Sequence, residues 1–246
     1  MLNRIEAKVF EIIRANVPGK DTRIVELAPG EGSLTQALVD SGYNNVEALD
    51  INPQRFEGKG VKCRKGNLNE PLPFESDSFD LVIAVEGIEH LENQYRFASE
   101  INRILKGNGY AIITTPNIIN FASRMRYLMT GFYALAARPS SEFEKNWVIE
   151  HIYPLTFWQL RHILHTNGLF IDQIETDHIR KSSIVGLLFY PFAYLLTWKS
   201  LAKEGDNRQR EKNKEILRQI HLPAIYLGRT QIIFAQKRKN SYIKAT

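Results

Sequence analysis

The chain has 246 residues, of which 43% are hydrophobic and 24% charged, and a formal net charge of +5. These values are those of a globular protein with a full core, and the modest positive charge does not require a nucleic-acid partner. Cys63 is the only cysteine, which excludes an intrachain disulfide. The N-terminal residues mix charges along an amphipathic helix and form no signal peptide, which predicts a cytoplasmic protein.

Apolar runs predict seven strands, at about residues 23–28, 46–50, 61–65, 80–85, 109–115, 169–176 and 229–236. Strands and helices alternate through residue 118, which predicts parallel pairing with right-handed crossovers. Ser33 with Gln36, and Thr156 with Gln159, have the spacing of capping boxes at helix starts. The pattern is that of an α/β domain.

The first strand leads into a glycine turn suited to a ligand. Gly30 and Gly32 let the backbone turn sharply and approach a ligand closely, since neither has a Cβ. Asp50 ends the next strand about twenty residues later, where a carboxylate accepts hydrogen bonds from the two hydroxyls of a ribose. The sequence therefore predicts a nucleoside-binding domain.

The identity of the nucleoside follows from what the turn lacks. Thr35 stands where the dinucleotide fingerprint needs its third glycine, and no Gly-Lys-Ser/Thr of a P-loop follows the turn. Glu26 would repel a pyrophosphate but suits a cationic ligand group. S-adenosylmethionine, which carries an ammonium and a sulfonium and no phosphate, fits better.

Five segments in order resemble the motifs of class I S-adenosylmethionine-dependent methyltransferases, the methyltransferase type 11 group that includes the ubiquinone-biosynthesis O-methyltransferases. They are Glu26-Leu-Ala-Pro-Gly-Glu-Gly32, Ala48-Leu-Asp50-Ile51, Gly66-Asn-Leu-Asn-Glu-Pro-Leu-Pro-Phe74, Ser78-Phe-Asp-Leu-Val-Ile-Ala-Val-Glu-Gly-Ile-Glu-His-Leu91 and Arg103-Ile-Leu-Lys-Gly-Asn-Gly-Tyr-Ala-Ile-Ile-Thr-Thr-Pro116. The resemblance covers residues 20–118 by motif and extends more weakly to about 238. Ala28 departs from the family pattern, which usually has glycine there. Alanine is a mild change that could shift the loop.

The resemblance implies a Rossmann-like, seven-stranded, mostly parallel sheet with helices on both faces and a reversed final edge strand. The whole chain, 1–246, is then one domain with a core of 20–118, 151–176 and 229–238. Residues 117–150 and 177–228 are insertions. Because ligands bind beyond the carboxyl ends of the strands, the first insertion is expected to cover the acceptor site.

The resemblance also implies a set of residues that bind the cofactor. Asp50 is expected on the ribose, Ile51 beside the adenine, and the Asn67 side-chain oxygen on the adenine amino group, where the family commonly has an acidic residue. The full predicted set is Glu26, Ala28, Gly30, Gly32, Asp50, Ile51, Asn67, Leu68, Val85 and Glu86.

Catalytic candidates lie after the fourth strand and before the capped helix at Thr156. Glu86, Glu89 and His90 form Glu-x-x-Glu-His, in which Glu86 and His90 can face the same side. His90, Glu89 and His151 are the predicted catalytic residues, the histidines because an imidazole titrates near neutral pH and can take the proton of an acceptor hydroxyl. The ubiquinone O-methyltransferases offer a precedent for a divalent metal at the Glu-x-x-Glu-His positions, but three residues make an incomplete cage, and no metal ligands are assigned.

Residues 182–198 are seventeen consecutive residues without a charge, preceded by Arg180-Lys181 and followed by Lys199. Pro191 in the middle and the length argue against a spanning helix. Tyr190, Tyr194 and Trp198 recur every four residues, as in an interfacial anchor. The segment is either a peripheral contact with the inner membrane surface or a lid or homodimer interface.

The acceptor is the least constrained feature. No D/N-P-P-Y/F tetrapeptide follows the fourth strand and no basic cluster is interleaved with aromatic residues, which argues against nucleic-acid substrates. Arg124 and Arg126, on an expected helix, are either an anion contact or a solvated basic face. We expect O-methylation of a small or lipid-linked acceptor, such as a quinone-like ring or a glycan hydroxyl. The alternatives are a soluble metabolite, or a non-catalytic cofactor-binding partner subunit.

Overall fold

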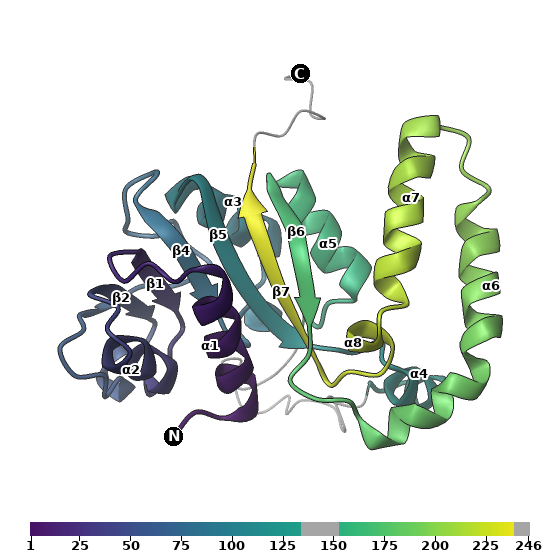
Figure 1. The fold of residues 1–246 in the computed structure, drawn as a ribbon, viewed down its shortest axis with the longest axis horizontal. Helices are drawn as coiled ribbons and strands as arrows, with labels where there is room; N and C mark the ends of the chain where they lie inside the picture. The colour runs from purple at the N-terminus through teal and green to yellow at the C-terminus, as the bar shows by residue number, and fades with distance from the viewer. Residues whose placement is uncertain (134–152, 239–246) are drawn as a thin grey trace.

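The computed structural model describes residues 1–133 and 153–238, which form a seven-stranded sheet between two helical layers (Figure 1). The strand order is β3-β2-β1-β4-β5-β7-β6. The strands are β1 (Arg23–Leu27), β2 (Asn45–Asp50), β3 (Cys63–Lys65), β4 (Phe79–Ala84), β5 (Leu105–Pro116), β6 (Leu169–Glu175) and β7 (Thr230–Lys237). All seven predicted strands are confirmed.

Pairing is parallel from β3 through β5, and β7 runs antiparallel to both β5 and β6. The Rossmann-like fold class and the reversal of the final strand are therefore confirmed. Its expected position at the edge is wrong, because β7 lies between β5 and β6. Six of its eight residues are buried, including Ile232 to Ala235 on both faces, which suits an interior strand.

Helices cover both faces of the sheet (Figure 1). The α-helices are α1 (Arg4–Asn16), α2 (Ser33–Asp40), α3 (Gln94–Ile104), α4 (Phe121–Thr130), α5 (Phe157–Thr166), α6 (Tyr190–Leu201), α7 (Asn207–Ile220) and α8 (Pro223–Tyr226). Apolar residues of α1 and α2 pack on one face and those of α3 and α5 on the other, which gives two core clusters. Burial of these two clusters is the main stabilising contribution of the fold.

One predicted cap is confirmed and the other is wrong. Thr156 and Gln159 form a capping box at the start of α5. At α2 the N-cap is Gly32, with φ 84°, and Ser33 is the first helical residue without a capping bond. Gln36 instead donates to Asp40 and accepts from the Lys59 backbone N–H. Because the N-cap is Gly32 and not Ser33, the cap lies one residue earlier than predicted. Glycine has no side chain that could accept from the first N–H groups of α2.

The segments outside the minimal sheet domain form a helical extension beside β6 and β7. The 3-10 helix η3 (Lys181–Phe189) runs into α6, and α6 and α7 stand side by side as a helical hairpin (Figure 1). Arg124 and Arg126 lie on α4, as predicted for a helix there. His151 lies outside the described residues, as does most of the insertion expected over the acceptor site, so that expectation stays a prediction.

Candidate active site

A cavity of about 510 Å³ opens beyond the carboxyl ends of β1, β2 and β4. This is the edge where the crossing connections of a parallel sheet leave room for a ligand. Seven of the ten predicted cofactor-binding residues line it, namely Ala28, Gly30, Asp50, Ile51, Asn67, Leu68 and Glu86. Its volume is in the range of small-molecule sites. The structure thus brings residues from four separate motifs to one place.

The turn after β1 holds its shape through two left-handed residues that face the cavity. Gly30 has φ 57°, and a Cβ built on it would meet nothing within 4 Å, so its missing side chain leaves open space in the cavity. Ala28 has the same φ of 57°, a conformation that costs an alanine about 1–2 kcal/mol relative to glycine. Its N–H donates to the Leu49 carbonyl at 2.8 Å, which fixes the turn against β2. Alanine therefore preserves the turn at the cost of local strain.

Asp50 is positioned by the backbone on both sides of the cavity. Its Oδ2 accepts from the Gly30 N–H at 3.4 Å and its Oδ1 from the Asn52 N–H at 2.8 Å. Each carboxylate oxygen has a second lone pair, so both can still accept a ligand hydroxyl. Asn52 and Arg55 also line the cavity, directly after the residues predicted to meet ribose and adenine.

Asn67 meets the cavity with part of its hydrogen-bonding capacity already in use. Its side-chain oxygen accepts from the Asn69 N–H at 3.0 Å, and its amide donates to Glu70 at 3.3 Å. The second lone pair of that oxygen is still available to an adenine amino group.

Glu26, Gly32 and Val85 lie outside the cavity lining. Glu26 is buried and accepts a hydrogen bond from the Thr35 hydroxyl, and burial raises its pKa to about 7. The hydrogen bond between Glu26 and Thr35 therefore ties the end of β1 to α2. Gly32 is favoured by its left-handed backbone, with φ 84°, and a Cβ there would also stand 2.5 Å from the Phe56 ring.

The Glu-x-x-Glu-His segment divides between the cavity and the core. Glu86 and His90 both line the cavity, but Glu86 precedes the short 3-10 helix Ile88–His90, so the two do not share a helical face as expected. Burial raises the pKa of Glu86, opposed by the nearby charge of Arg229. Glu89 is fully buried outside the cavity lining, and burial raises its pKa to about 8, against the smaller lowering effect of hydrogen bonds that include one from Thr115. At neutral pH Glu89 is mostly protonated, which suits packing in the core and does not suit a base at the cavity.

The same arrangement bears on the metal precedent. A divalent site at Glu86, Glu89 and His90 needs three donors facing one point, and Glu89 is buried in the core outside the cavity that Glu86 and His90 line. Across residues 1–133 and 153–238, no three His, Cys, Asp or Glu side chains are grouped to hold a metal ion. The donor set does not fit a metal, and no chemistry is assigned to one.

Residues 25–113 match the family model described as a methyltransferase domain. A probable S-adenosylmethionine-dependent methyltransferase of Mycolicibacterium smegmatis is 33% identical over 119 residues, which are 46% of this chain and 45% of that protein. The ubiquinone biosynthesis O-methyltransferase of Rickettsia typhi is 33% identical over 104 residues, 39% of this chain and 41% of that protein. Residues 25–113 therefore form a methyltransferase domain of the class I S-adenosylmethionine-dependent type.

The matches cover only part of each relative. The chain spans less than half the length of the curated relatives it matches. A solved S-adenosylmethionine-dependent methyltransferase from Mesorhizobium loti is 14% identical, covers 95% of this chain and all of its own, and has a TM-score of 0.57. At that identity the likeness shows the fold alone. It extends the methyltransferase fold to the parts of the chain beyond the five motifs.

The structure places a charged group near Glu86 that was not predicted from the sequence. Asp177, after β6, accepts from His178 Nδ1 at 2.7 Å and pairs with Arg229 at 3.6 Å. Arg229 and Asp177 both act on the pKa of Glu86, in opposite directions. Such a group offers a cation and an imidazole to an acceptor. The residues come from distant segments, so no local pattern in the sequence marks them.

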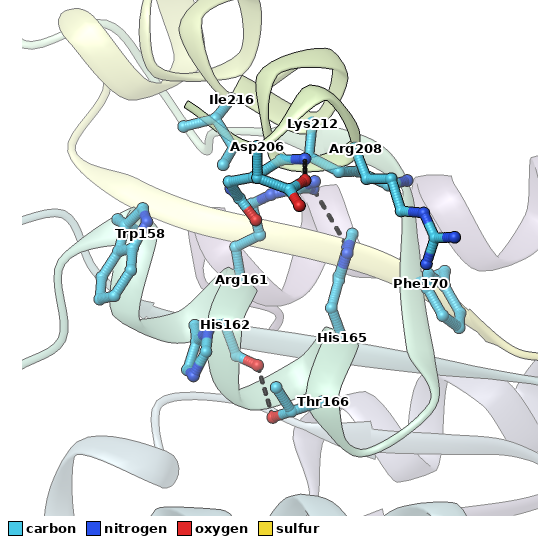
Figure 2. Close-up of a pocket in the computed structure, with 11 residues that line it drawn as sticks. Trp158, Arg161, His162, His165, Thr166, Phe170, Asp206, Arg208, Lys212 and Ile216 are labelled. Carbon is cyan, nitrogen blue, oxygen red and sulfur yellow. Dashed lines mark hydrogen bonds between the residues drawn. The ribbon is translucent and has the colours of Figure 1, made fainter. Parts of the chain in front are cut away.

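A second cavity, of about 590 Å³, lies between α5, β6 and α7 (Figure 2). Its buried Arg161 pairs with Glu215 at 3.2 Å and donates to Gln219 at 2.9 Å, which ties α5 to α7. His165 Nε2 accepts from Arg161 and from the Ile171 N–H, both at 3.2 Å, and burial followed by the Arg161 charge lowers its pKa to about 3. These polar side chains of the cavity pair with one another, and the Arg161 contacts hold α7 against α5.

Proposed function

We propose that this chain is an S-adenosylmethionine-dependent methyltransferase that O-methylates a small or lipid-linked acceptor, such as a quinone-like ring or a glycan hydroxyl. The observation that carries the proposal is the cavity at the carboxyl ends of β1, β2 and β4, where the glycine turn, Asp50, Glu86 and His90 meet. S-adenosylmethionine supplies a methyl group already activated by a sulfonium when it is bound. The rest of the chemistry belongs to the chain.

The cavity fits that cofactor in shape and charge. The open space above Gly30 admits a ligand against the backbone, and the Asp50 oxygens each keep a lone pair for a ribose hydroxyl. Asp50 and Glu86 are acidic residues of the cavity lining, where negative charge suits a cationic ligand, and a bound cation would favour the charged form of Glu86. The electrostatic argument for a sulfonium cofactor therefore rests on Glu86 and Asp50.

Methyl transfer asks two things of the residues around the acceptor. They hold the acceptor oxygen in line with the methyl carbon, and they take the hydroxyl proton as the new oxygen–carbon bond forms. His90 lines the cavity and is the proton acceptor that we assign. Arg229, which pairs with Asp177, acts on the pKa of Glu86, so an acceptor with an anionic group would find a cation on this side of Glu86.

The acceptor class is inferred from chemistry and from one relative. The Rickettsia typhi relative is a ubiquinone biosynthesis O-methyltransferase, which supports a quinone-like hydroxyl as acceptor. A soluble metabolite is the second candidate. A non-catalytic cofactor-binding subunit is the third, favoured only by Ala28 and Asn67, the two departures from the family motifs.

The test is transfer of labelled methyl from S-adenosylmethionine into separate lipid and soluble extracts. We expect label in the lipid extract with the unmodified chain, and loss of it in His90→Asn. His162→Asn is the matched control, because His162 lies on the outer side of α5 stacked on Trp158. Label confined to the soluble extract would favour the metabolite, and no label in either extract despite cofactor binding would favour the non-catalytic subunit.

A further inference from the structure

The helical extension presents a continuous apolar surface, formed by α4, η3 and α6 and called here the outer face. In the part of the chain that the structure describes, 15 of the 21 exposed large hydrophobic residues lie within 125–132 or 184–198. Leu188 and Met129 are 81% and 79% exposed. The two segments are in contact, since α4 packs on η3. A surface this apolar is a binding surface for another phase or molecule.

The packing of η3 and α6 is the inverse of a water-soluble helix. The inward stripe is made of small or polar residues, namely Ser183, Gly186, Tyr190, Ala193 and Thr197, and the large aliphatic residues point outward. A surface helix of a soluble domain buries its apolar stripe and exposes its polar one. This sequence places its large apolar residues where water would be.

Specific contacts fix the inverted orientation. Ser183 donates to the Asn120 side chain at 3.1 Å, and the Gly186 carbonyl accepts from the Tyr226 hydroxyl at 3.0 Å. A Cβ on Gly186 would stand 2.4 Å from the Phe121 ring, so only glycine allows this close approach of η3 to α4. These polar and small residues therefore pack inward, which leaves the large apolar residues of η3 and α6 exposed on the outer face.

The segments that form the outer face carry charge of one sign. No Asp or Glu occurs in residues 178–203 or 117–133, and Arg180, Lys181, Lys199 and Lys203 flank the apolar run. These flanking cations complement an anionic surface. In a two-fold dimer through the same face they would meet their own copies, because such an interface joins identical patches.

The length of the segment raises the question of whether it crosses a bilayer. Lys181–Leu201 is a helical segment of 21 residues whose most apolar 18-residue window has a mean hydropathy of 1.3, which is long and apolar enough to span, and only 6% of that window is buried. Pro191 does not break it, because it stands at the start of α6, where a proline is tolerated. However, the charged helix α7 packs along α6, and spanning would draw α7 into hydrocarbon (Figure 1).

We propose that the outer face docks on an anionic lipid bilayer, with α4, η3 and α6 lying in the interface and the flanking cations on lipid phosphates. The large aliphatic residues enter the acyl boundary while α7 stays in water. α4 and η3 lie on the side of the sheet where β5 ends, and α6 runs from there along the flank of the molecule beside α7 (Figure 1). The proposal concerns binding alone and does not rest on the chemistry at the cofactor cavity.

The experiment is co-sedimentation of the full chain with phosphatidylcholine vesicles, with and without phosphatidylglycerol. We expect binding that is stronger with phosphatidylglycerol and weakened by salt. Leu188→Gln with Phe192→Gln should reduce binding by about tenfold or more, since each removes a large exposed apolar side chain that would enter the acyl boundary.

Trp198 and Trp158 provide a matched pair, because they are 52% and 48% exposed on different faces. Trp198→Gln should weaken vesicle binding, and Trp158→Gln should not. Equal binding of both variants would overturn the assignment of the outer face. Absence of vesicle binding, together with a dimer that Leu188→Gln dissociates by light scattering, would overturn the lipid proposal in favour of a second copy.

Discussion

Glu89 gives the sharpest link between sequence, burial and a measurable quantity. It is fully buried, and burial raises its pKa to about 8. The folded chain therefore holds this proton more tightly than the unfolded chain, in which the carboxyl has its ordinary value near 4.5. Its contribution to stability is fully present below that value and is lost as pH rises through about 8.

The size of the effect follows from the size of the shift. Each pH unit between the two pKa values changes the free energy of unfolding by about 1.4 kcal/mol for one such group. From pH 5.5 to pH 7.5, Glu89 alone should lower the stability of the fold by about 2–3 kcal/mol. Glu89→Gln keeps the shape and a hydrogen-bonding side chain but cannot ionise, so its stability should lack this part of the decline.

The assay is urea unfolding at several pH values across that window, with the difference in slope between variant and unmodified chain as the readout. Glu92→Gln, exposed and three residues away on the same segment, is the control and should keep the unmodified slope. If Glu89→Gln destabilised the fold equally at every pH, the plot of the free energy of unfolding against pH would shift without a change in slope. Identical pH slopes for Glu89→Gln and the unmodified chain would refute the placement of a buried, protonatable Glu89.

Three further outcomes follow from the site. Ala28→Gly should raise the free energy of unfolding by up to about 1 kcal/mol in urea unfolding, because it relieves a left-handed alanine with φ 57°, and a decrease would contradict this strain. Gly30→Ala should weaken S-adenosylhomocysteine binding by calorimetry by about tenfold or more, because a methyl group would enter the cavity, and unchanged affinity would place the ligand elsewhere. His90→Asn should remove the ionisation on the acidic limb of kcat/KM against pH while leaving cofactor affinity within a few fold, and a retained limb would assign the base to another group.

The fold could be predicted because its strands are continuous apolar runs. Such runs and the glycine turns after them can be recognised without knowing any distant contact. Their alternation with helices predicted the parallel half of the sheet. The position of β7 could not be read in this way, since the sequence marks a strand but not its neighbours. β7 is an interior strand because β5 pairs along one of its edges and β6 along the other.

The candidate site was predictable where one motif segment fixes both backbone and side chain. Asp50 and Gly30 lie at strand ends, and both line the cavity. Glu26 was expected to face a ligand, but its direction depends on Thr35 in the next helix. Asp177 and Arg229 approach Glu86 only through the return of β7, a contact between distant segments that no spacing reveals.

The apolar run shows the same limit. Its composition was visible, but the aromatic repeat expected to form one exposed stripe is divided by the fold. Tyr190 turns inward against His221 and Tyr226, with ring centroids at 5.4 and 5.3 Å, while Trp198 is exposed. The outward face is built chiefly from the aliphatic residues between them, because the small residues Ser183 and Gly186 set which side packs on α4.

The central claim is that the cavity beyond β1, β2 and β4 binds S-adenosylmethionine through Asp50. Calorimetric titration with S-adenosylmethionine and S-adenosylhomocysteine tests it directly, with Asp50→Asn beside Asp40→Asn, an exposed aspartate at the end of α2. We predict one site per chain for both ligands, at least about tenfold weaker in Asp50→Asn because charge-assisted hydrogen bonds are lost, and unchanged in Asp40→Asn. Binding that is equal in the two variants, or absent from the unmodified chain, would contradict the account.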